Sequence, residues 1–203
     1  MKLGGEKFKE SSFKNLVDLK NLFEKENIKY WIECGLLLGL YREGDMINGD
    51  EDDVDISIPI EYVNQFTNNL SEIKKLGFSI RRINYSKKGI ITAIALRRIS
   101  RVDIHIIATK NNIVYFQMYK IKHTISKWGV YVYPSKLFNP LGEIDWNGEK
   151  FPCPNNIKEY LIVRYGKDWK INKMKTGEWT NCRDLKLNPC LQIWDSNKLG
   201  KLL

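Results

Sequence analysis

The stretch from Trp31 to Ile60, WIECGLLLGLYREGDMINGDEDDVDISIPI, decides how this chain folds. It ends in DVDISI over residues 53–58, a strict alternation of polar and apolar residues. Successive side chains of a strand point to opposite faces, so Asp53 and Asp55 share the face opposite the apolar residues. The alternation therefore predicts a strand over residues 54–60 that packs on a core and holds two carboxylates side by side.

Two carboxylates held that close repel each other, and one tends to keep its proton unless a cation lies between them. A divalent cation would relieve the repulsion and make the pair suited to phosphoryl transfer. A solvated acidic turn ahead of an ordinary strand is the simpler alternative. A calcium loop of the EF-hand type fits poorly, because its sixth position requires glycine and is Asp55 when counted from Asp50.

Two other segments carry residues that belong with this strand. Gly35 and Gly39 bracket a short apolar segment, which predicts a tight strand-to-helix turn where a phosphate can approach the backbone. Within the strand expected over residues 101–109, residues 101–106 repeat the alternation, with Asp103 and His105 on the polar face. An Asp within a hydrophobic strand is costly without a partner. A metal shared with the first two carboxylates would supply one, and an ion pair with Arg97, Arg98 or Arg101 is the alternative.

The rest of the chain predicts an α+β fold. Apolar periodicity indicates helices over residues 12–27, 36–41, 61–76 and 155–164, and strands over 29–34, 78–85, 90–99, 101–109 and 113–119. Short connections favour antiparallel pairing of the later strands, and Asn147-Gly148 predicts a hairpin over 143–154. The expected caps are Ser11 or Ser12 for the first helix and Asn155 or Asn156 for the last, with Gly77 ending the third.

These elements predict a mixed, largely antiparallel sheet flanked by helices. We expect a single domain over residues 1–203, with a core of about 12–170 and a tail of 171–203 whose structure the pattern leaves open. No segment approaches the roughly 18 apolar residues of a transmembrane span, and the N-terminus lacks the apolar stretch of a signal peptide. The sequence therefore predicts a soluble, cytoplasmic protein.

The charge and the cysteine content limit which binding partners, metal sites and disulfides we expect. The formal net charge of +9 favours anionic ligands, but the lysines are scattered, which argues against sequence-specific nucleic-acid binding. The four cysteines, Cys34, Cys153, Cys182 and Cys190, form no C-x-x-C pair, and the two histidines are far apart, so we expect no zinc site of known spacing. Free thiols are expected, with a Cys182–Cys190 disulfide as the alternative in an oxidising compartment.

Together these features resemble the LicD/fukutin family, which has a nucleotidyltransferase (polymerase-beta-like) fold. The resemblance covers about residues 30–170 and rests on CGLLLG (34–39), REG (42–44), EDDVDI (51–56), VDI (102–104), FPCP (151–154), YL (160–161) and YGKDW (165–169). Leu36 stands where the family usually has Ser or Thr, and Gly49-Asp50 replaces a Trp that often precedes the acidic cluster. The zinc-binding insertion of some animal members is not visible.

The resemblance implies a phosphotransferase that moves a phospho-alcohol, such as phosphocholine or ribitol phosphate, from a CDP-linked donor to a sugar hydroxyl of a glycan. It implies Mg²⁺ or Mn²⁺ as cofactor. The implied catalytic residues and metal ligands are Asp53, Asp55 and Asp103, with Glu51 as a further ligand. The implied substrate-binding residues are Gly35, Leu36, Arg42 and His105.

Several of these roles have alternatives. Arg42 can instead pair with Glu43 or Asp45, and His105 can be a structural histidine with satisfied hydrogen bonds. The residues at 165–169 are expected to pack rather than to react. A different enzyme on the same fold would transfer NMP from an NTP to a small molecule, a protein or RNA. A basic binding module without activity is a further alternative.

Overall fold

The computed structural model describes residues 4–85, 91–120, 127–171 and 191–195, which fold around the acidic stretch. Strand β2 (Asp53–Pro59) occupies that stretch. β5 (Arg101–Lys110) runs parallel to it, and the short β1 (Trp31–Ile32) pairs antiparallel with its other edge. The strand predicted over 54–60 is confirmed with a shift of one residue, because Ile60 begins a 3₁₀ turn (Ile60–Tyr62).

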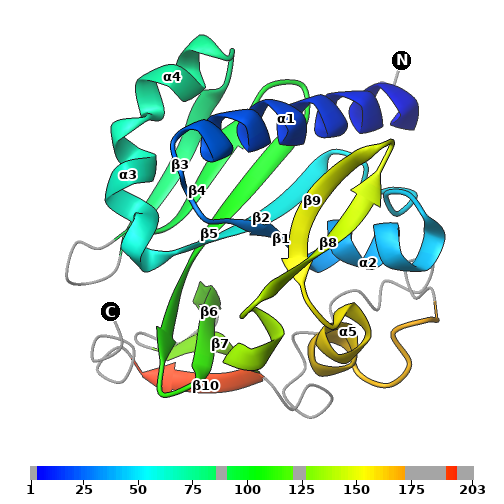
Figure 1. Ribbon diagram of the computed structural model, residues 1–203, viewed down its shortest axis with the longest axis vertical. Helices are drawn as coiled ribbons and strands as arrows, with labels where there is room; N and C mark the ends of the chain where they lie inside the picture. The colour runs from blue at the N-terminus through cyan, green and yellow to red at the C-terminus, as the bar shows by residue number, and fades with distance from the viewer. Residues whose placement is uncertain (1–3, 86–90, 121–126, 172–190, 196–203) are drawn as a thin grey trace.

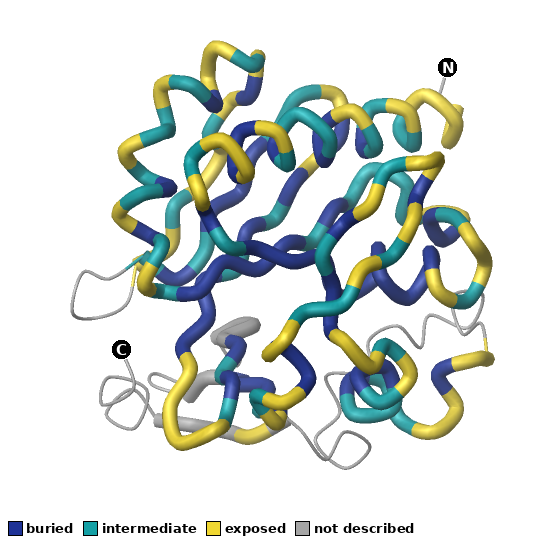
Figure 2. Tube along the Cα trace, viewed as in Figure 1, coloured by how far each residue is buried: buried dark blue, intermediate teal, exposed yellow. Residues whose placement is uncertain are grey.

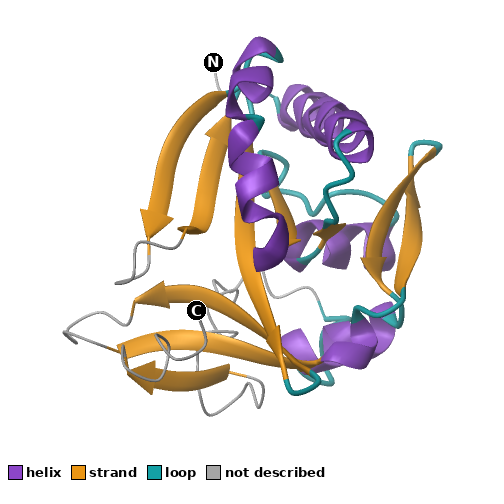
Figure 3. Ribbon diagram, turned by 60° about the vertical axis from the view of Figure 1, so that its left-hand side comes forward, coloured by secondary structure: helices purple, strands orange, loops and turns teal. Residues whose placement is uncertain are grey.

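The described residues form one eight-stranded mixed sheet and a separate hairpin. The other strands of the sheet are β3 (Ser79–Tyr85), β4 (Ile91–Arg97), β6 (Ile113–Lys120), β7 (Lys127–Pro134) and β10 (Leu191–Asp195). β5 pairs with β4 along its first half and with β6 along its second half, so two branches of strands leave it (Figure 3). The predicted α+β class, mixed sheet and antiparallel later strands are confirmed. Part of the tail, β10, joins the sheet beside β7.

Helix α1 (Gly5–Lys25) crosses the sheet, and α3 (Val63–Asn68) and α4 (Leu70–Lys75) follow β2 (Figure 1). The hairpin β8 (Leu141–Trp146) and β9 (Glu149–Pro154) lies next to β1, with α2 (Cys34–Glu43) and α5 (Ile157–Tyr165) nearby. The apolar residues of β2 and β5 are buried in one core with those of α1, and buried chain runs through the middle of the molecule (Figure 2). The alternation thus leaves the polar residues of β2 and β5 on the other face of the sheet.

The first helix is longer than the sequence predicted, and its predicted cap is wrong. α1 begins at Gly5 rather than residue 12, and its cap residue, Gly4, makes no side-chain capping bond. Ser12 Oγ instead donates to the Glu51 carbonyl at 2.7 Å, and Ser11 Oγ accepts from the Ser100 amide at 3.1 Å. The two serines therefore fasten the middle of the helix to the turns that precede β2 and β5.

The helix predicted over 61–76 is wrong as a single element, because it is interrupted at Asn69 between α3 and α4. The side-chain Nδ2 of Asn69 donates to the Gln65 carbonyl at 3.0 Å and to Glu26 Oε2 at 3.3 Å. Asn side chains compete with the helix for backbone groups in this way. Gly77 ends the segment as predicted, with a positive φ of 90°.

The hairpin and the last helix follow their local sequence. Asn147 and Gly148 have positive φ of 53° and 82°, as a two-residue turn between antiparallel strands requires. The Asn156 side chain accepts from the Glu159 amide at 3.0 Å and caps α5, which confirms one of the two predicted caps. Cys34 and Cys153 are buried free thiols, whereas Cys182 and Cys190 lie outside the described residues.

None of the helices in the described ranges is both long and apolar enough to cross a membrane.

Gly39 allows α2 to approach the turn that follows it. A Cβ at this position would lie 2.6 Å from the Asp45 carbonyl oxygen and 2.9 Å from the Ile47 amide nitrogen. Because these are backbone atoms, we expect Gly39→Ala to lower the free energy of unfolding by about 1–3 kcal/mol. Urea denaturation measures this. Gly4→Ala adds a methyl in open space and should change it by less than about 0.5 kcal/mol. Equal stability of the two variants would contradict the proposed clash.

Candidate active site

Three carboxylates meet on the polar face of β2 and β5. The parallel register sets Asp55 beside Asp103 and Asp53 beside Arg101. Asp53, Asp55 and Asp103 each place one carboxylate oxygen within 4.8 Å of the others. Their side chains are about one-fifth exposed, at 19%, 18% and 21%. The structure thus brings together the three aspartates that the alternating strands singled out.

The arrangement is costly for negative charge. Burial, with the neighbouring charge of Asp55, raises the pKa of Asp53 to about 6, although Arg101 opposes the shift. Burial also raises the pKa of Asp103, against the effect of Arg101. The pKa of Asp50, which lies in the turn before β2, rises to about 7 through burial and the charges of Asp53 and Asp55. The cluster therefore has more buried negative charge than its own residues neutralise.

Arg101 partly offsets this charge. Its Nε donates to Asp53 Oδ1 at 3.0 Å, and its Nη2 donates to Asp53 Oδ2. The same Nε lies 3.6 Å from Asp103 Oδ2. The sequence left open whether Asp103 joins the other two aspartates or pairs with an arginine, and the structure contains both arrangements. Of the arginines considered, Arg101 makes the contact, whereas Arg98 pairs with Asp18.

One oxygen of Asp103 stands apart from these contacts. Among the described residues, no hydrogen-bond donor reaches Asp103 Oδ1, which is buried. A buried acceptor without a donor costs on the order of 1–3 kcal/mol. The set consists entirely of carboxylate oxygens, which Mg²⁺ and Mn²⁺ prefer over the softer ligands that suit zinc or copper. An oxygen without a donor in an all-oxygen cluster fits such an ion.

His105, which lies on β5 with Asp103, contacts the Asp55 carboxylate of β2. Its Nε2 is 3.1 Å from Asp55 Oδ1, and its ring packs on Phe116 with centroids 4.6 Å apart. Burial acts to lower the pKa of His105, but the bond to Asp55 and the nearby Glu33 and Asp103 raise it overall. The ring therefore orients the Asp55 carboxylate.

Buried hydrogen bonds of Glu33 and Tyr160 hold the turn from β1 into α2 in place. Glu33 is 1% exposed, and burial raises the pKa of its carboxyl group to about 7. The Glu33 carboxylate accepts from the Ser57 hydroxyl and, at 3.2 Å, from the Tyr160 hydroxyl. Tyr160 Oη also accepts from the Cys34 amide at 3.2 Å. These bonds hold Cys34 at a positive φ of 55° and so set the start of α2 beside Asp55.

Arg164 of α5 completes this buried support. Arg164 is 2% exposed, and its guanidinium donates to Tyr133 Oη at 3.0 Å and to Cys34 Sγ at 3.3 Å. It also lies 3.8 Å from the centre of the Tyr131 ring, a cation–π contact. Sequence reasoning missed Glu33 and Arg164, because a charged residue within an apolar segment does not reveal its distant partners.

The other predicted site residues lie in different places. Gly35 is buried in the first turn of α2, where amide groups have no partner within the helix. Leu36 directs its side chain into the core at 1% exposure, so it can offer a ligand only its backbone. Glu51 lies outside the group of three, because its carboxylate sits against Gly5 and its carbonyl binds Ser12.

Arg42 lies near the far end of α2. Its Nε donates to Glu43 Oε1 at 3.0 Å, and its Nη1 donates to the Trp169 carbonyl at 3.3 Å. Trp169 is buried and packs on Tyr41, with ring centroids 5.7 Å apart. The structure thus contains the predicted alternative of a Glu43 ion pair, and the expected packing of the residues at 165–169.

Comparison with known proteins agrees with the resemblance. Residues 27–156 match the family described as LicD/FKTN/FKRP, nucleotidyltransferase domain. An uncharacterized protein of Rickettsia typhi is 42% identical over 71 residues, which are 35% of this chain and 23% of that protein. An uncharacterized protein of Rickettsia prowazekii is 29% identical over 156 residues, 74% of this chain and 54% of that protein. The chain thus spans about half or less of the length of these curated relatives.

The matched segment contains the turn at Gly35, strand β2 and Asp103, and it covers more than half of the 203 residues. The chain is therefore a member of the LicD/FKTN/FKRP family.

Proposed function

We propose that this protein is a metal-dependent phosphotransferase with a nucleotidyltransferase (polymerase-beta-like) fold. It moves a phospho-alcohol, such as phosphocholine or ribitol phosphate, from a CDP-linked donor to a sugar hydroxyl of a glycan. Membership of the family suggests a transferase that modifies glycans. The observation that carries the proposal is the convergence of Asp53, Asp55 and Asp103 beside the start of α2.

The three aspartates would hold Mg²⁺ or Mn²⁺, which would neutralise the diphosphate of the donor and the charge on the departing CMP. The first-turn amides of α2 at Gly35 and Leu36 would bind a donor phosphate, because a helix N-terminus attracts anions. Glu33 and Tyr160 would keep that turn in place through their bonds to each other and to the Cys34 amide. His105 would hold the Asp55 carboxylate in orientation.

The transfer itself requires one bond to form and one to break. The sugar oxygen attacks the phosphorus that carries the alcohol, and the bond from that phosphorus to the CMP oxygen breaks. CMP leaves with the electron pair, and the hydroxyl proton passes to a base. A carboxylate that binds the metal through one oxygen, as Asp103 would through Oδ1, keeps its second oxygen as a proton acceptor, which suits Asp103 to this role.

Product analysis tests the proposal. The protein is incubated with CDP-choline, CDP-ribitol, CTP or ATP, with Mg²⁺ or Mn²⁺ and a mixture of sugars, and the products are identified by mass spectrometry. We expect CMP and a phospho-alcohol-modified sugar from a CDP-linked donor, and loss of both products with EDTA. Pyrophosphate released from CTP or ATP would instead establish the NMP-transferring alternative. No turnover of any donor would contradict the proposal.

A further inference from the structure

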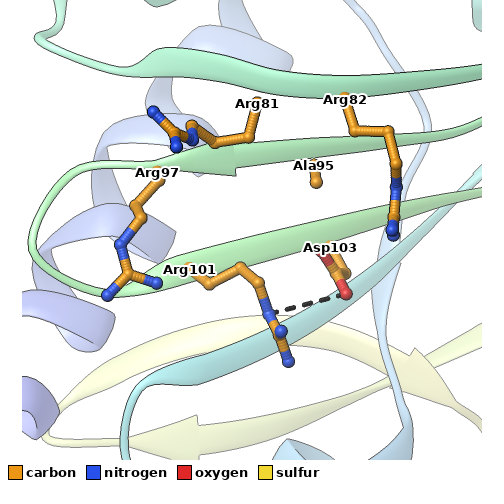
Figure 4. A pocket seen from close by; sticks show the side chains of 6 residues that line it. All are labelled: Arg81, Arg82, Ala95, Arg97, Arg101 and Asp103. Atoms are coloured by element: carbon orange, nitrogen blue, oxygen red, sulfur yellow. Dashed lines mark ion pairs between the residues drawn. The ribbon is translucent and has the colours of Figure 1, made fainter.

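A cavity rich in arginine opens beside the carboxylates. It has a volume of about 460 Å³ and is lined by Arg81, Arg82, Ala95, Arg97, Arg101 and Asp103 (Figure 4). This size lies within the range of small-molecule sites. Four guanidinium groups around one carboxylate give it a strongly positive interior, whereas the adjoining cluster of aspartates is negative.

The register of the sheet builds this cavity as an extension of the active site. Two rows of side chains run across β2, β5 and β4: Asp53, Arg101 and Arg97 in one, and Asp55, Asp103 and Ala95 in the other. Directly opposed residues of an antiparallel pair such as β4 and β5 have Cβ atoms about 4.5–5.5 Å apart. The small side chain of Ala95 leaves the space that the cavity occupies next to Asp103.

A bulge on β3 brings two arginines to the same place. The pairing of β3 with β4 shifts between Ile80 and Arg82: Ile80 pairs with Leu96, Arg82 pairs with Ala95, and Arg81 is the extra residue between them. In a regular strand, Arg81 and Arg82 would point to opposite faces. A bulge re-aims a side chain, and here both arginines line one cavity. Figure 4 shows Asp103 between the guanidinium groups of Arg82 and Arg101.

Most of the positive charge in the cavity is not balanced by ion pairs among the described residues. Arg101 is paired with Asp53 and Asp103. In the described ranges, no ion pair is formed by Arg81, Arg82 or Arg97. Arg81 and Arg82 are exposed and Arg97 is half-buried. Three unpaired guanidinium groups match a dianion better than a single carboxylate, and guanidinium binds phosphate oxygens in bidentate geometry.

The position of the cavity indicates which substrate it serves. β1, which leads into the start of α2, lies on one side of β2, whereas β5, β4 and β3 follow on the other. If the donor diphosphate binds at the start of α2, the arginines lie across the carboxylates from it. The acceptor must approach the reacting phosphorus from the side opposite the leaving group, which is the side of the arginines.

We propose that the arginine cavity binds a phosphate group carried by the sugar acceptor, so that the protein selects phosphorylated glycans. This proposal rests on the proposed function, because that function places the donor at α2. Arg81, Arg82 and Arg97 hold the acceptor phosphate, and the hydroxyl to be modified then lies over Asp103.

Calorimetry without metal tests the cavity separately from catalysis. Glucose 6-phosphate is titrated in EDTA at low salt into the wild type, into Arg81→Gln/Arg82→Gln, and into Lys74→Gln/Lys110→Gln. The last variant also removes two exposed positive charges, away from the cavity. We expect binding to weaken at least about tenfold in the arginine variant and to stay within about twofold in the lysine variant. Glucose, which lacks the phosphate, should bind none of the three.

A second titration, with CDP and Mn²⁺, separates the acceptor from the donor. CDP affinity should be the same in the wild type and the arginine variant. A matching loss of CDP affinity would assign the cavity to the donor and overturn the proposal, as would equal glucose 6-phosphate binding by all three proteins. Failure of the proposed function would appear as a lack of CMP release. It would leave the metal-free glucose 6-phosphate result unchanged, so the two failures are distinguishable.

Discussion

Asparagine in place of Asp103 is expected to lower CMP release from a CDP-linked donor by at least about 100-fold, while the protein stays folded. Residues that only support metal ligands already contribute about 10–100-fold, and Asp103 is proposed to contact the reaction directly. The apo protein should be as stable as the wild type or more so. The substitution removes one of three mutually repelling carboxylates, and its amide is neutral where Asp103 Oδ1 has no donor among the described residues.

Activity and thermal melting measure the two parts of this prediction. In the wild type, Mn²⁺ should raise the melting temperature, because it binds the folded protein, and in Asp103→Asn this rise should be largely lost. Asp52→Asn is a matched control, since it removes one negative charge from the turn before β2 without entering the group of three. Full activity of Asp103→Asn, or an equal loss in both variants, would contradict the assignment.

Arg164→Met is expected to lower the free energy of unfolding by about 3 kcal/mol. The change removes a buried cation, leaves the Tyr133 hydroxyl without the Arg164 donor and abolishes the cation–π contact with Tyr131. It also removes a positive charge near the buried Glu33 carboxylate, whose pKa Arg164 helps to hold down. Methionine keeps the unbranched apolar part of the side chain, so the loss reflects mainly the missing guanidinium contacts. Urea denaturation measures the change.

Lys158→Ala is the control for Arg164→Met, because Lys158 lies on the exposed side of the same helix. Its free energy of unfolding should change by less than about 0.5 kcal/mol. Arg164→Lys keeps the charge but loses the forked donor geometry, and its stability should fall between the wild type and Arg164→Met. An unchanged free energy of unfolding in Arg164→Met would show that the contacts of Arg164 with Tyr133, Cys34 and Tyr131 do not stabilise the fold.

Local patterns in the sequence were sufficient to predict the strands that carry the carboxylates. The alternation at residues 53–58 and 101–106 sets which side chains share a face, and the parallel register then aligns Asp55 with Asp103. The turn at Asn147-Gly148 and the cap at Asn156 were also predictable, because each depends on a few adjacent residues. The start of α1 was not, because Ser11 and Ser12 look like caps but bind Ser100 and Glu51.

The buried residues that hold the turn into α2 in place make contacts with residues far away in the sequence. Tyr160 is 127 positions from Glu33, and Arg164 is 130 positions from Cys34. Nothing adjacent to these residues indicates such partners. The arginine cavity depends on a register shift at Arg81, which the composition of β3 does not reveal. The sequence therefore predicted the residues proposed to react and the neighbouring His105, but neither the contacts of Glu33 and Arg164 at the turn into α2 nor the arginine cavity.

The central claim is that Asp53, Asp55 and Asp103 together bind a divalent cation. A crystal structure with Mn²⁺ and CDP, with anomalous diffraction recorded near the manganese edge, tests it most directly. We predict an anomalous peak within about 2.0–2.3 Å of an oxygen from each of the three carboxylates, with the donor diphosphate on the side of α2. A peak elsewhere, or Arg101 still bound to Asp53 with no peak beside it at saturating Mn²⁺, would contradict the account.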